Sequence, residues 1–317
     1  MKALGILAVS AALITLAGCG SDDGAAAAPE GAALSVVATT PEVADFVRNI
    51  GGDDVAVTQI IKPNVDPHEY EPTPADIKAI GEAKVVVKNG VGLEAWLDQT
   101  ISSAGFKGTV VDSSQGVTLR EGGHEEGEEE HAEGEGEDHD PHIWHDPRNA
   151  KIMVTNIEKA LAAADPDDAG AYAKNLADYT AKLDKLDADN EAAFAKLPAA
   201  DRKLVTNHDA FGYYVDRYHL QFVGSVIPSL DTSAELSAQQ LTDLVAKIKA
   251  TGTKAIFTES SLPPKSAEAI AKQAGVKVIG GADALYGDSL GEPGTPTGTY
   301  LGAEEHNTKV IVDALAG

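Results

Sequence analysis

Short apolar runs rich in β-branched residues alternate along the chain with segments in which apolar residues recur at helical spacing. The apolar runs predict buried strands at residues 35–40, 55–61, 84–90, 108–112, 203–206, 221–226, 254–258 and 276–279. The periodic segments predict helices that open near residues 41, 74 and 93, and others at 209–218, 237–251, 264–274 and 303–315. Apolar strands that alternate with helices are typical of parallel sheets covered on both faces. Each half of the chain is therefore predicted to form an α/β unit.

Residues 166–198 have a different pattern. Apolar and aromatic side chains recur there at three- and four-residue spacing from Tyr172 to Phe194, and neither Gly nor Pro occurs between Gly170 and Pro198. The pattern predicts one amphipathic helix, roughly 40–45 Å long at 1.5 Å per residue. We therefore expect two lobes of parallel-type sheet flanked by helices, at residues 34–164 and 200–317, joined by a long rigid helix at 165–199. Ligands of such sheets bind beyond the carboxyl ends of the strands, so a site is expected in the cleft between the lobes.

The first 33 residues predict export and membrane attachment. Lys2 precedes an apolar stretch at residues 3–16, which is too short for an ordinary membrane-spanning helix. Leu16-Ala17-Gly18-Cys19 resembles a bacterial lipobox, although a plain secretory signal with a chance cysteine is the alternative. We expect a lipoprotein signal peptide at residues 1–19 that ends at lipidated Cys19, followed by a flexible tether at 20–33. The lipid would anchor the protein outside the cytoplasm, at the cell surface or facing the periplasm.

The charge of the chain narrows the class of ligand. The formal net charge is −25, which argues against nucleic acid as a partner because nucleic-acid binding needs a basic surface. Residues 121–140 hold eleven acidic residues, three His and no Lys or Arg. With almost nothing apolar to bury, this stretch predicts a solvated loop of the first lobe. Its imidazoles, His124, His131 and His139, also predict weak auxiliary capture of metal ions, which choose imidazole and carboxylate ligands.

Four polar side chains follow predicted strands, in segments that are predicted to be loops. They are His68, His142, His208 and Asp288. A single His is more often a surface or core residue than a ligand, but the strand ends of two facing sheets would gather all four in one cleft. Three imidazole nitrogens and one carboxylate oxygen suit Zn²⁺. The sequence therefore predicts a metal site to which both lobes contribute.

Longer motifs occur around these residues. They are Asn64–Thr73, Asp140–Pro147, Thr206–Tyr213 and Tyr286–Gly291, with further segments at Thr258–Ser261 and Tyr300–Asn307. In this order, over residues 35–315, they resemble the zinc- and manganese-binding solute receptors of bacterial ABC importers, the cluster A-I (cluster 9) group. The resemblance implies a metal ion held between two lobes by His68 and His142 of the first and His208 and Asp288 of the second. It also implies a receptor rather than an enzyme, with ABC permease subunits as partners, and we expect a monomer.

Two features favour a zinc-type member of this group. In the group that this chain resembles, His at the third ligand position is typical of zinc-type receptors, and Glu is typical of manganese-type receptors. The third ligand position of this chain is His208. An acidic His-rich loop is likewise a feature of the zinc-type receptors. We therefore expect Zn²⁺ as the transported ligand, with Mn²⁺ less favoured. A manganese receptor of the same family and a metal-binding surface adhesin are the alternatives. A zinc hydrolase is not favoured, because four protein ligands would leave no open position on the metal for the water that such an enzyme uses.

Three further side chains are candidates for places beside the ligands. Glu69 and Glu259 are carboxylates of the kind that orient ligating His. His145 occupies a position where the family often has an apolar residue, so it is a candidate for such an orienting role or for an alternative ligand. His219 and His306 lie in segments predicted to be structural and are left out of the site.

Overall fold

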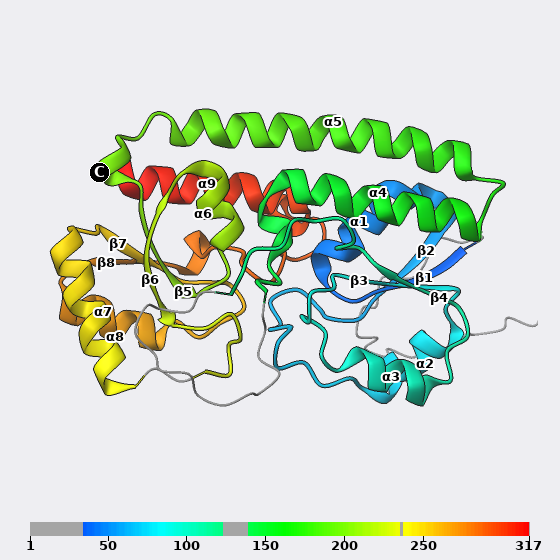
Figure 1. Cartoon of the computed structure of the whole chain (residues 1–317), viewed down its shortest axis with the longest axis horizontal. Helices are drawn as coiled ribbons and strands as arrows, with labels where there is room; N and C mark the ends of the chain where they lie inside the picture. The colour runs from blue at the N-terminus through cyan, green and yellow to red at the C-terminus, as the bar shows by residue number, and fades with distance from the viewer. Residues whose placement is uncertain (1–33, 123–138, 235–236, 317) are drawn as a thin grey trace, which may run out of the picture.

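Two α/β lobes lie side by side beneath a layer of long helices (Figure 1). The computed structural model describes residues 34–122, 139–234 and 237–316. The expected signal peptide, Cys19, the tether and most of the acidic loop, with His124 and His131, lie outside these described residues. None of the helices within the described ranges is both long enough and apolar enough to cross a membrane.

The described part of the N-terminal lobe contains a four-stranded parallel sheet in the order β2-β1-β3-β4. Its strands are β1 (Leu34–Ala38), β2 (Val55–Gln59), β3 (Val85–Lys88) and β4 (Thr109–Asp112). Helices on one face are α1 (Pro41–Gly51) and α4 (Pro147–Ala164), and those on the other are α2 (Pro74–Glu82) and α3 (Leu97–Ala104). Successive residues of a strand serve opposite faces, so Val36 packs in the core under α1 and α4 and Val37 in the core under α2 and α3.

The C-terminal lobe is built in the same way from two parallel pairs of strands, β5–β6 and β7–β8, with β5 against β7. The strands are β5 (Lys203–His208), β6 (Gln221–Ile227), β7 (Ala255–Phe257) and β8 (Lys277–Ile279). The helices are α6 (Gly212–Tyr218), α7 (Ala238–Thr251), α8 (Lys265–Ala274) and α9 (Tyr300–Ala316). Leu204 of β5 packs with α6 and α9, whereas the next residue, Val205, packs with α7 and α8. Burial on both faces explains the apolar pair at the centre of β5 and the wholly apolar β7.

Two helices connect the cores of the lobes. The expected linking helix is α5 (Ala169–Phe194), whose 26 residues span about 39 Å. Its buried residues from Tyr172 to Leu186 pack in the N-terminal core, and its last residue, Phe194, lies in the C-terminal core. Helix α9 makes the same crossing in the same direction, because its first residue, Tyr300, belongs to the N-terminal core and Leu315 belongs to the C-terminal core. Figure 1 shows α9 running alongside α5.

Helix α4 is not among the elements expected from the sequence, although its signal is present. Asp146 caps the helix and Pro147 occupies its first turn, as is common at helix starts. Buried apolar side chains then recur at helical spacing, at Ala150, Met153, Val154, Ile157 and Leu161. The helix expected near residue 93 begins at Leu97, because residues 91–96 form turns. Short 3-10 helices cover Gly52–Asp54, Ile143–His145, Ala199–Asp201, Gly281–Asp283 and Pro296–Gly298.

Candidate metal centre

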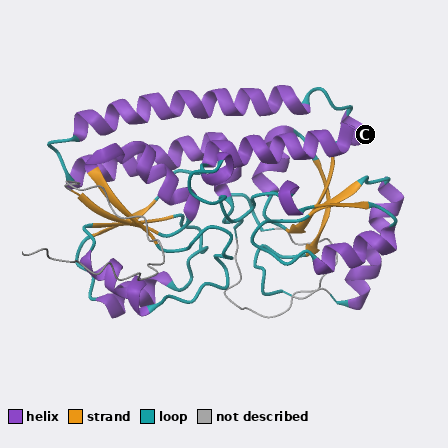
Figure 2. Ribbon diagram, turned by 180° about the vertical axis from the view of Figure 1, so that it is seen from behind, coloured by secondary structure: helices purple, strands orange, loops and turns teal. Residues whose placement is uncertain are grey.

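Each of the four predicted ligands lies at a strand end or between a strand and the next helix. His68 lies between β2 and α2, and His142 lies between β4 and α4. Asp288 lies between β8 and α9, whereas His208 is the last residue of β5 itself and not, as expected, a residue of the loop after it. Loops of both lobes occupy the region between the two sheets (Figure 2). Each lobe therefore contributes two of the four side chains to this region.

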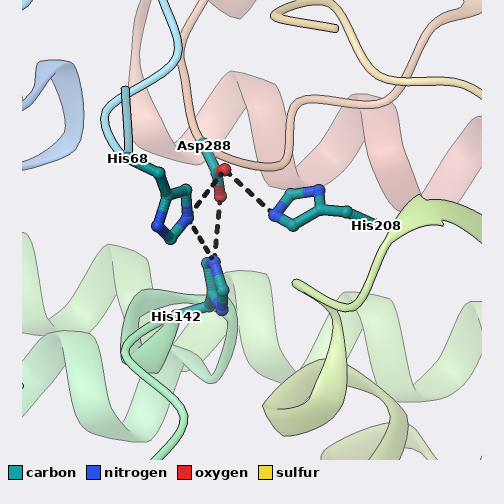
Figure 3. A group of neighbouring side chains, drawn as sticks. All are labelled: His68, His142, His208 and Asp288. Atoms are coloured by element: carbon teal, nitrogen blue, oxygen red, sulfur yellow. Dashed lines mark hydrogen bonds and ion pairs between the residues drawn. The ribbon is translucent and has the colours of Figure 1, made fainter. Parts of the chain in front are cut away.

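The four side chains converge on one place (Figure 3). One ligand atom from each lies within 4.8 Å of the corresponding atoms of the other three. The Asp288 carboxylate is central, with oxygens 3.4 Å from His68 Nε2, 3.3 Å from His142 Nε2 and 3.0 Å from His208 Nε2. His68 Nε2 and His142 Nε2 are 3.2 Å apart. Three Nε2 atoms and one carboxylate thus surround a common space.

This group of side chains is almost completely shielded from solvent. His142, His208 and Asp288 have 0% of their side chains exposed, and His68 has 1%. Burial alone would raise the pKa of Asp288, but the neighbouring His208 and His142 hold it well below its usual range. Burial would lower the pKa of His208 and of His68, but Asp288 raises both, that of His208 well above its ordinary value. The site therefore favours positive charge, whether protons or a cation carry it.

The short contacts that the Asp288 oxygens make with the three imidazoles are not aligned hydrogen bonds. His208 Nε2 and Asp288 Oδ2 are 3.0 Å apart, yet neither atom has an aligned hydrogen-bond partner among the described residues. Buried polar atoms normally have such a partner. Atoms that are close without being aligned point to a shared centre rather than to one another. This is how ligands surround a metal ion, and the donor set of three nitrogens and one carboxylate fits a divalent transition metal.

Carboxylates hold the outer ring nitrogens of two of the imidazoles. Asp140 Oδ1 is 2.8 Å from His142 Nδ1 and accepts the backbone N–H of His142 at 3.0 Å. Glu259 Oε1 is 2.8 Å from His208 Nδ1 and accepts the backbone N–H of His208 at 3.0 Å. A carboxylate at Nδ1 fixes the orientation of the ring and leaves Nε2 free to bind metal. Gly287 makes room for this contact, because a Cβ there would lie 2.1 Å from Glu259 Oε2.

Known proteins are similar to this chain in sequence and in fold. Residues 36–314 match the ZnuA family model, whose description is zinc-uptake complex component A, periplasmic. The chain belongs to the ZnuA family. Members of this family are solute receptors and not enzymes, as expected from the sequence.

Relatives of this ZnuA-family chain are named for two different metals. The manganese ABC transporter substrate-binding lipoprotein PsaA of Streptococcus mitis is 33% identical over 327 residues, which cover 100% of both chains. The manganese-binding lipoprotein MntA of Bacillus subtilis is 35% identical and the match covers 97% of each chain. The structure of the periplasmic zinc-binding protein TroA of Treponema pallidum superposes with a TM-score of 0.80 at 32% identity, over 89% of this chain and 99% of TroA. The chain is thus a metal-binding receptor of ABC importers with the two-lobed fold of TroA.

Other expected site residues of this ZnuA-family protein lie in different surroundings. His145 is buried away from the four-residue group, with Nδ1 2.8 Å from Glu304 Oε1 and its ring stacked on Phe211. Glu69 is exposed, and Glu259 contacts His208 as described above. His139 is exposed and forms an isolated antiparallel bridge with Glu121.

Asp140 is absent from the site residues expected from the sequence, although a local signal points to it. The tripeptide Asp-Pro-His occurs twice, at residues 66–68 and 140–142. In both copies the Asp Oδ1 accepts the backbone N–H of the His two residues later, at 2.9 Å for His68 and 3.0 Å for His142. The repeated tripeptide therefore builds the same turn before two of the predicted ligands. Glu304 has no comparable signal, because its partner His145 lies 159 residues earlier.

Proposed function

We propose that this receptor captures Zn²⁺ outside the cytoplasm through His68, His142, His208 and Asp288 and delivers it to an ABC-type membrane permease. The convergence of three imidazole Nε2 atoms with a single carboxylate carries the proposal. Zinc is commonly bound by four ligands of this kind, whereas manganese favours sites richer in oxygen. The zinc-uptake description of the family and the zinc-binding TroA support this choice.

Manganese is the second candidate, because PsaA and MntA are both named for it and are similar to this chain over nearly its whole length. His208 argues against manganese, because it supplies a third nitrogen donor. A carboxylate at this position would give the oxygen-rich donor set that manganese favours. The Glu259 carboxylate behind His208 further strengthens this imidazole as a ligand.

A competition titration separates the two metals. Chelator-stripped protein lacking residues 1–19 is titrated with Zn²⁺ and with Mn²⁺ in the presence of a chromophoric chelator. We expect tight one-to-one zinc binding that excess manganese does not displace. A His208→Glu variant should lose zinc affinity and gain manganese preference, because it exchanges a nitrogen donor for oxygen. A His219→Asn variant is the matched control, since His219 has a positive φ of 54°, which Asn tolerates, and lies outside the four-residue group.

Tight binding of manganese in preference to zinc would overturn the choice of metal and leave the receptor. Failure of the stripped protein to bind either ion tightly would overturn the proposal altogether. Equal zinc binding by wild type and by the His208→Glu variant would remove His208 from the ligand set.

We further propose that the acidic loop is an auxiliary capture region for zinc, through His124, His131 and His139. His139 is exposed, and the high acidic content of residues 121–140 favours the approach of cations, which supports weak binding. Replacing residues 123–138 with a short Gly-rich turn should lower the zinc stoichiometry or slow capture while the tight site is kept. Loss of the tight site on this replacement would mean that the loop supplies primary ligands.

Lipid attachment at Cys19 is proposed as the membrane anchor. The lipobox-like sequence supports it, and the relatives PsaA and MntA are named lipoproteins. A Cys19→Ser variant should lose incorporation of labelled fatty acid and leave the membrane fraction. Retention of both label and membrane attachment by this variant would exclude Cys19 as the attachment site.

A further inference from the structure

The two ends of the acidic loop lie together against the other lobe. Arg120 precedes the loop and Asp140 is its last residue, and the Asp140 N–H donates to the Arg120 carbonyl at 2.9 Å. Beside them, Glu121 and His139 form an antiparallel bridge. Both ends belong to the N-terminal lobe, yet their contacts reach helix α6 of the C-terminal lobe.

Tyr213 of α6 joins both ends of the loop through one hydroxyl group. Its oxygen accepts the Arg120 backbone N–H at 2.9 Å, and the hydroxyl donates to the Asp140 carbonyl at 3.1 Å. Asp216, one turn further along α6, accepts from Arg120 Nε at 3.1 Å. The Arg120 guanidinium also lies 3.5 Å from Asp140 Oδ2. We call Arg120, Asp140, Gly212, Tyr213 and Asp216 the Arg120 cluster.

The Arg120 cluster requires a glycine at position 212. A Cβ at this position would lie 2.5 Å from Arg120 Nη1 and 2.5 Å from Asp140 Oδ2. Real Cβ atoms do not approach other atoms so closely, so any larger residue would push the guanidinium and the carboxylate away from α6. The first residue of α6 is therefore small where the ion pair of the other lobe packs against it.

The cluster continues directly into the metal site. Asp140 Oδ2 pairs with the Arg120 guanidinium, and Asp140 Oδ1 accepts the backbone N–H of His142 and contacts its Nδ1 atom. A continuous chain of polar contacts thus runs from Asp216 and Tyr213 in one lobe to a ligand that the other lobe provides. Asp140 is fully buried, so the partners that it has in this cluster determine where its carboxylate stands.

We propose that Arg120 is a positioning residue for metal binding: with Tyr213 and Asp216 it holds Asp140, and through it the His142 ring, in the ligating orientation while the lobes are docked. The inference rests on the proposed zinc site. With Arg120 in this role, the retention of zinc depends on the contact between the lobes. A tilt of α6 away from the N-terminal lobe would release Asp140 and let the His142 ring turn.

A purely structural brace between the lobes is the competing explanation, and Arg217 provides the matched control. Arg217 lies on the same helix α6 and donates from Nε and Nη2 to Asp187 of α5 at 2.7 Å and 2.8 Å. Its side chain is 12% exposed, against 29% for Arg120. Among the described residues, the Arg217 ion pair makes no contact with Asp140 or His142, whereas Arg120 contacts Asp140 directly. Arg217→Gln therefore breaks an ion pair of α6 that is not connected to the proposed ligand, and Arg120→Gln breaks one that is.

The test measures the rate at which zinc leaves the protein when excess chelator is added, together with the melting temperature of the metal-free protein. We expect Arg120→Gln and Gly212→Ala to raise the dissociation rate about 3- to 10-fold, somewhat less than the 10- to 100-fold in affinity typical for direct partners of ligating His. Tyr213→Phe should act in the same direction. Arg217→Gln should lower the melting temperature and change the dissociation rate by less than about 2-fold.

Equal dissociation rates for Arg120→Gln and Arg217→Gln, at any melting temperature, would overturn the inference. If Arg120→Gln fails to fold, the exposed Asp216→Asn variant takes its place, with an expected increase of about 2-fold, and a rate equal to that of wild type would again overturn it. Absence of tight zinc binding in the wild type is a separate result, because it would refute the proposed function rather than the role of Arg120.

Discussion

Glu42 provides a test of how burial acts on a charged group in this protein. It lies in the first turn of α1, where an acidic residue is ordinarily exposed and favoured by the helix dipole. Here it is 1% exposed, and neither carboxylate oxygen has a hydrogen-bond partner among the described residues. Burial raises the pKa of Glu42 to about 8. Replacing it with Gln keeps the size of the side chain and removes the ionisation.

The size of the effect follows from linkage. A rise from 4.5 to about 8 is a shift of about 3.5 units, equivalent to about 5 kcal/mol at about 1.4 kcal/mol per unit. The folded state holds this proton more tightly than the unfolded chain does. The contribution of Glu42 to stability is therefore fully present below pH 4.5 and is lost as the pH rises to about 8. Relative to wild type, Glu42→Gln should be nearly neutral at about pH 5 and more stable by about 2–4 kcal/mol at about pH 8.

Urea unfolding of the chelator-stripped proteins at several pH values measures this difference, and subtracting wild type from variant cancels the other titrating groups. Glu268→Gln is the control, because Glu268 is an exposed acid in the first turn of α8. It should shift the free energy of unfolding by less than about 0.5 kcal/mol at every pH. A Glu42→Gln difference that stays constant between pH 5 and pH 8 would refute the reasoning, because it would mean that Glu42 ionises normally in the folded protein.

Three further predictions concern the site and the linking helix. Glu259→Gln should weaken zinc binding about 10- to 100-fold in a competition titration, because it removes the carboxylate that orients His208, and unchanged affinity would contradict this role. Zinc affinity should fall as the pH drops from about 7.5 to about 6, because Asp288 raises the pKa values of His68 and His208 and protons then compete with the metal. Zinc titrations at both pH values check this, and equal affinity at the two pH values would count against His ligation. Leu183→Ala in α5 should lower the free energy of unfolding by about 2–5 kcal/mol in urea, whereas the exposed Lys182→Ala should change it by less than about 0.5 kcal/mol; similar losses for the two would mean that α5 is not packed as described.

Much of the fold could be predicted because the central strands, such as β1 and β3, are buried on both faces. Val36 and Val37 serve opposite cores, so β1 contains a run of consecutive apolar residues that is visible in the sequence without any alternation. The three- and four-residue spacing from Tyr172 to Phe194 likewise made α5 predictable. The crossing of α9 between the lobes could not be predicted, because nothing local to Tyr300 indicates that it packs in the core formed by residues far earlier in the chain.

The site shows the same division between local and distant information. The side chains of His68, His142, His208 and Asp288 could be named from residue type and from their places after strands, with the family resemblance in support. His145, three residues after His142, has the same residue type, but its partner Glu304 comes from α9. Arg120 likewise gains its importance only when α6 docks beside it. Local pattern thus identifies donors, and the docking of the two lobes decides which of them meet.

The double connection by α5 and α9 sets the mechanical character of the protein. A single connecting helix would let one lobe rotate about the axis of that helix. Two connecting helices, each packed in both cores, resist twisting as well as bending of one lobe relative to the other. Pulling Phe194 or Tyr300 out of its core would cost about 3–5 kcal/mol, several times the thermal energy. The proposed ligands His68, His142 and Asp288 are instead carried by segments that contain no strand and no α-helix. At the proposed site, release of the metal would then need only loop opening and a small tilt of α6, without a wide rotation of one lobe against the other.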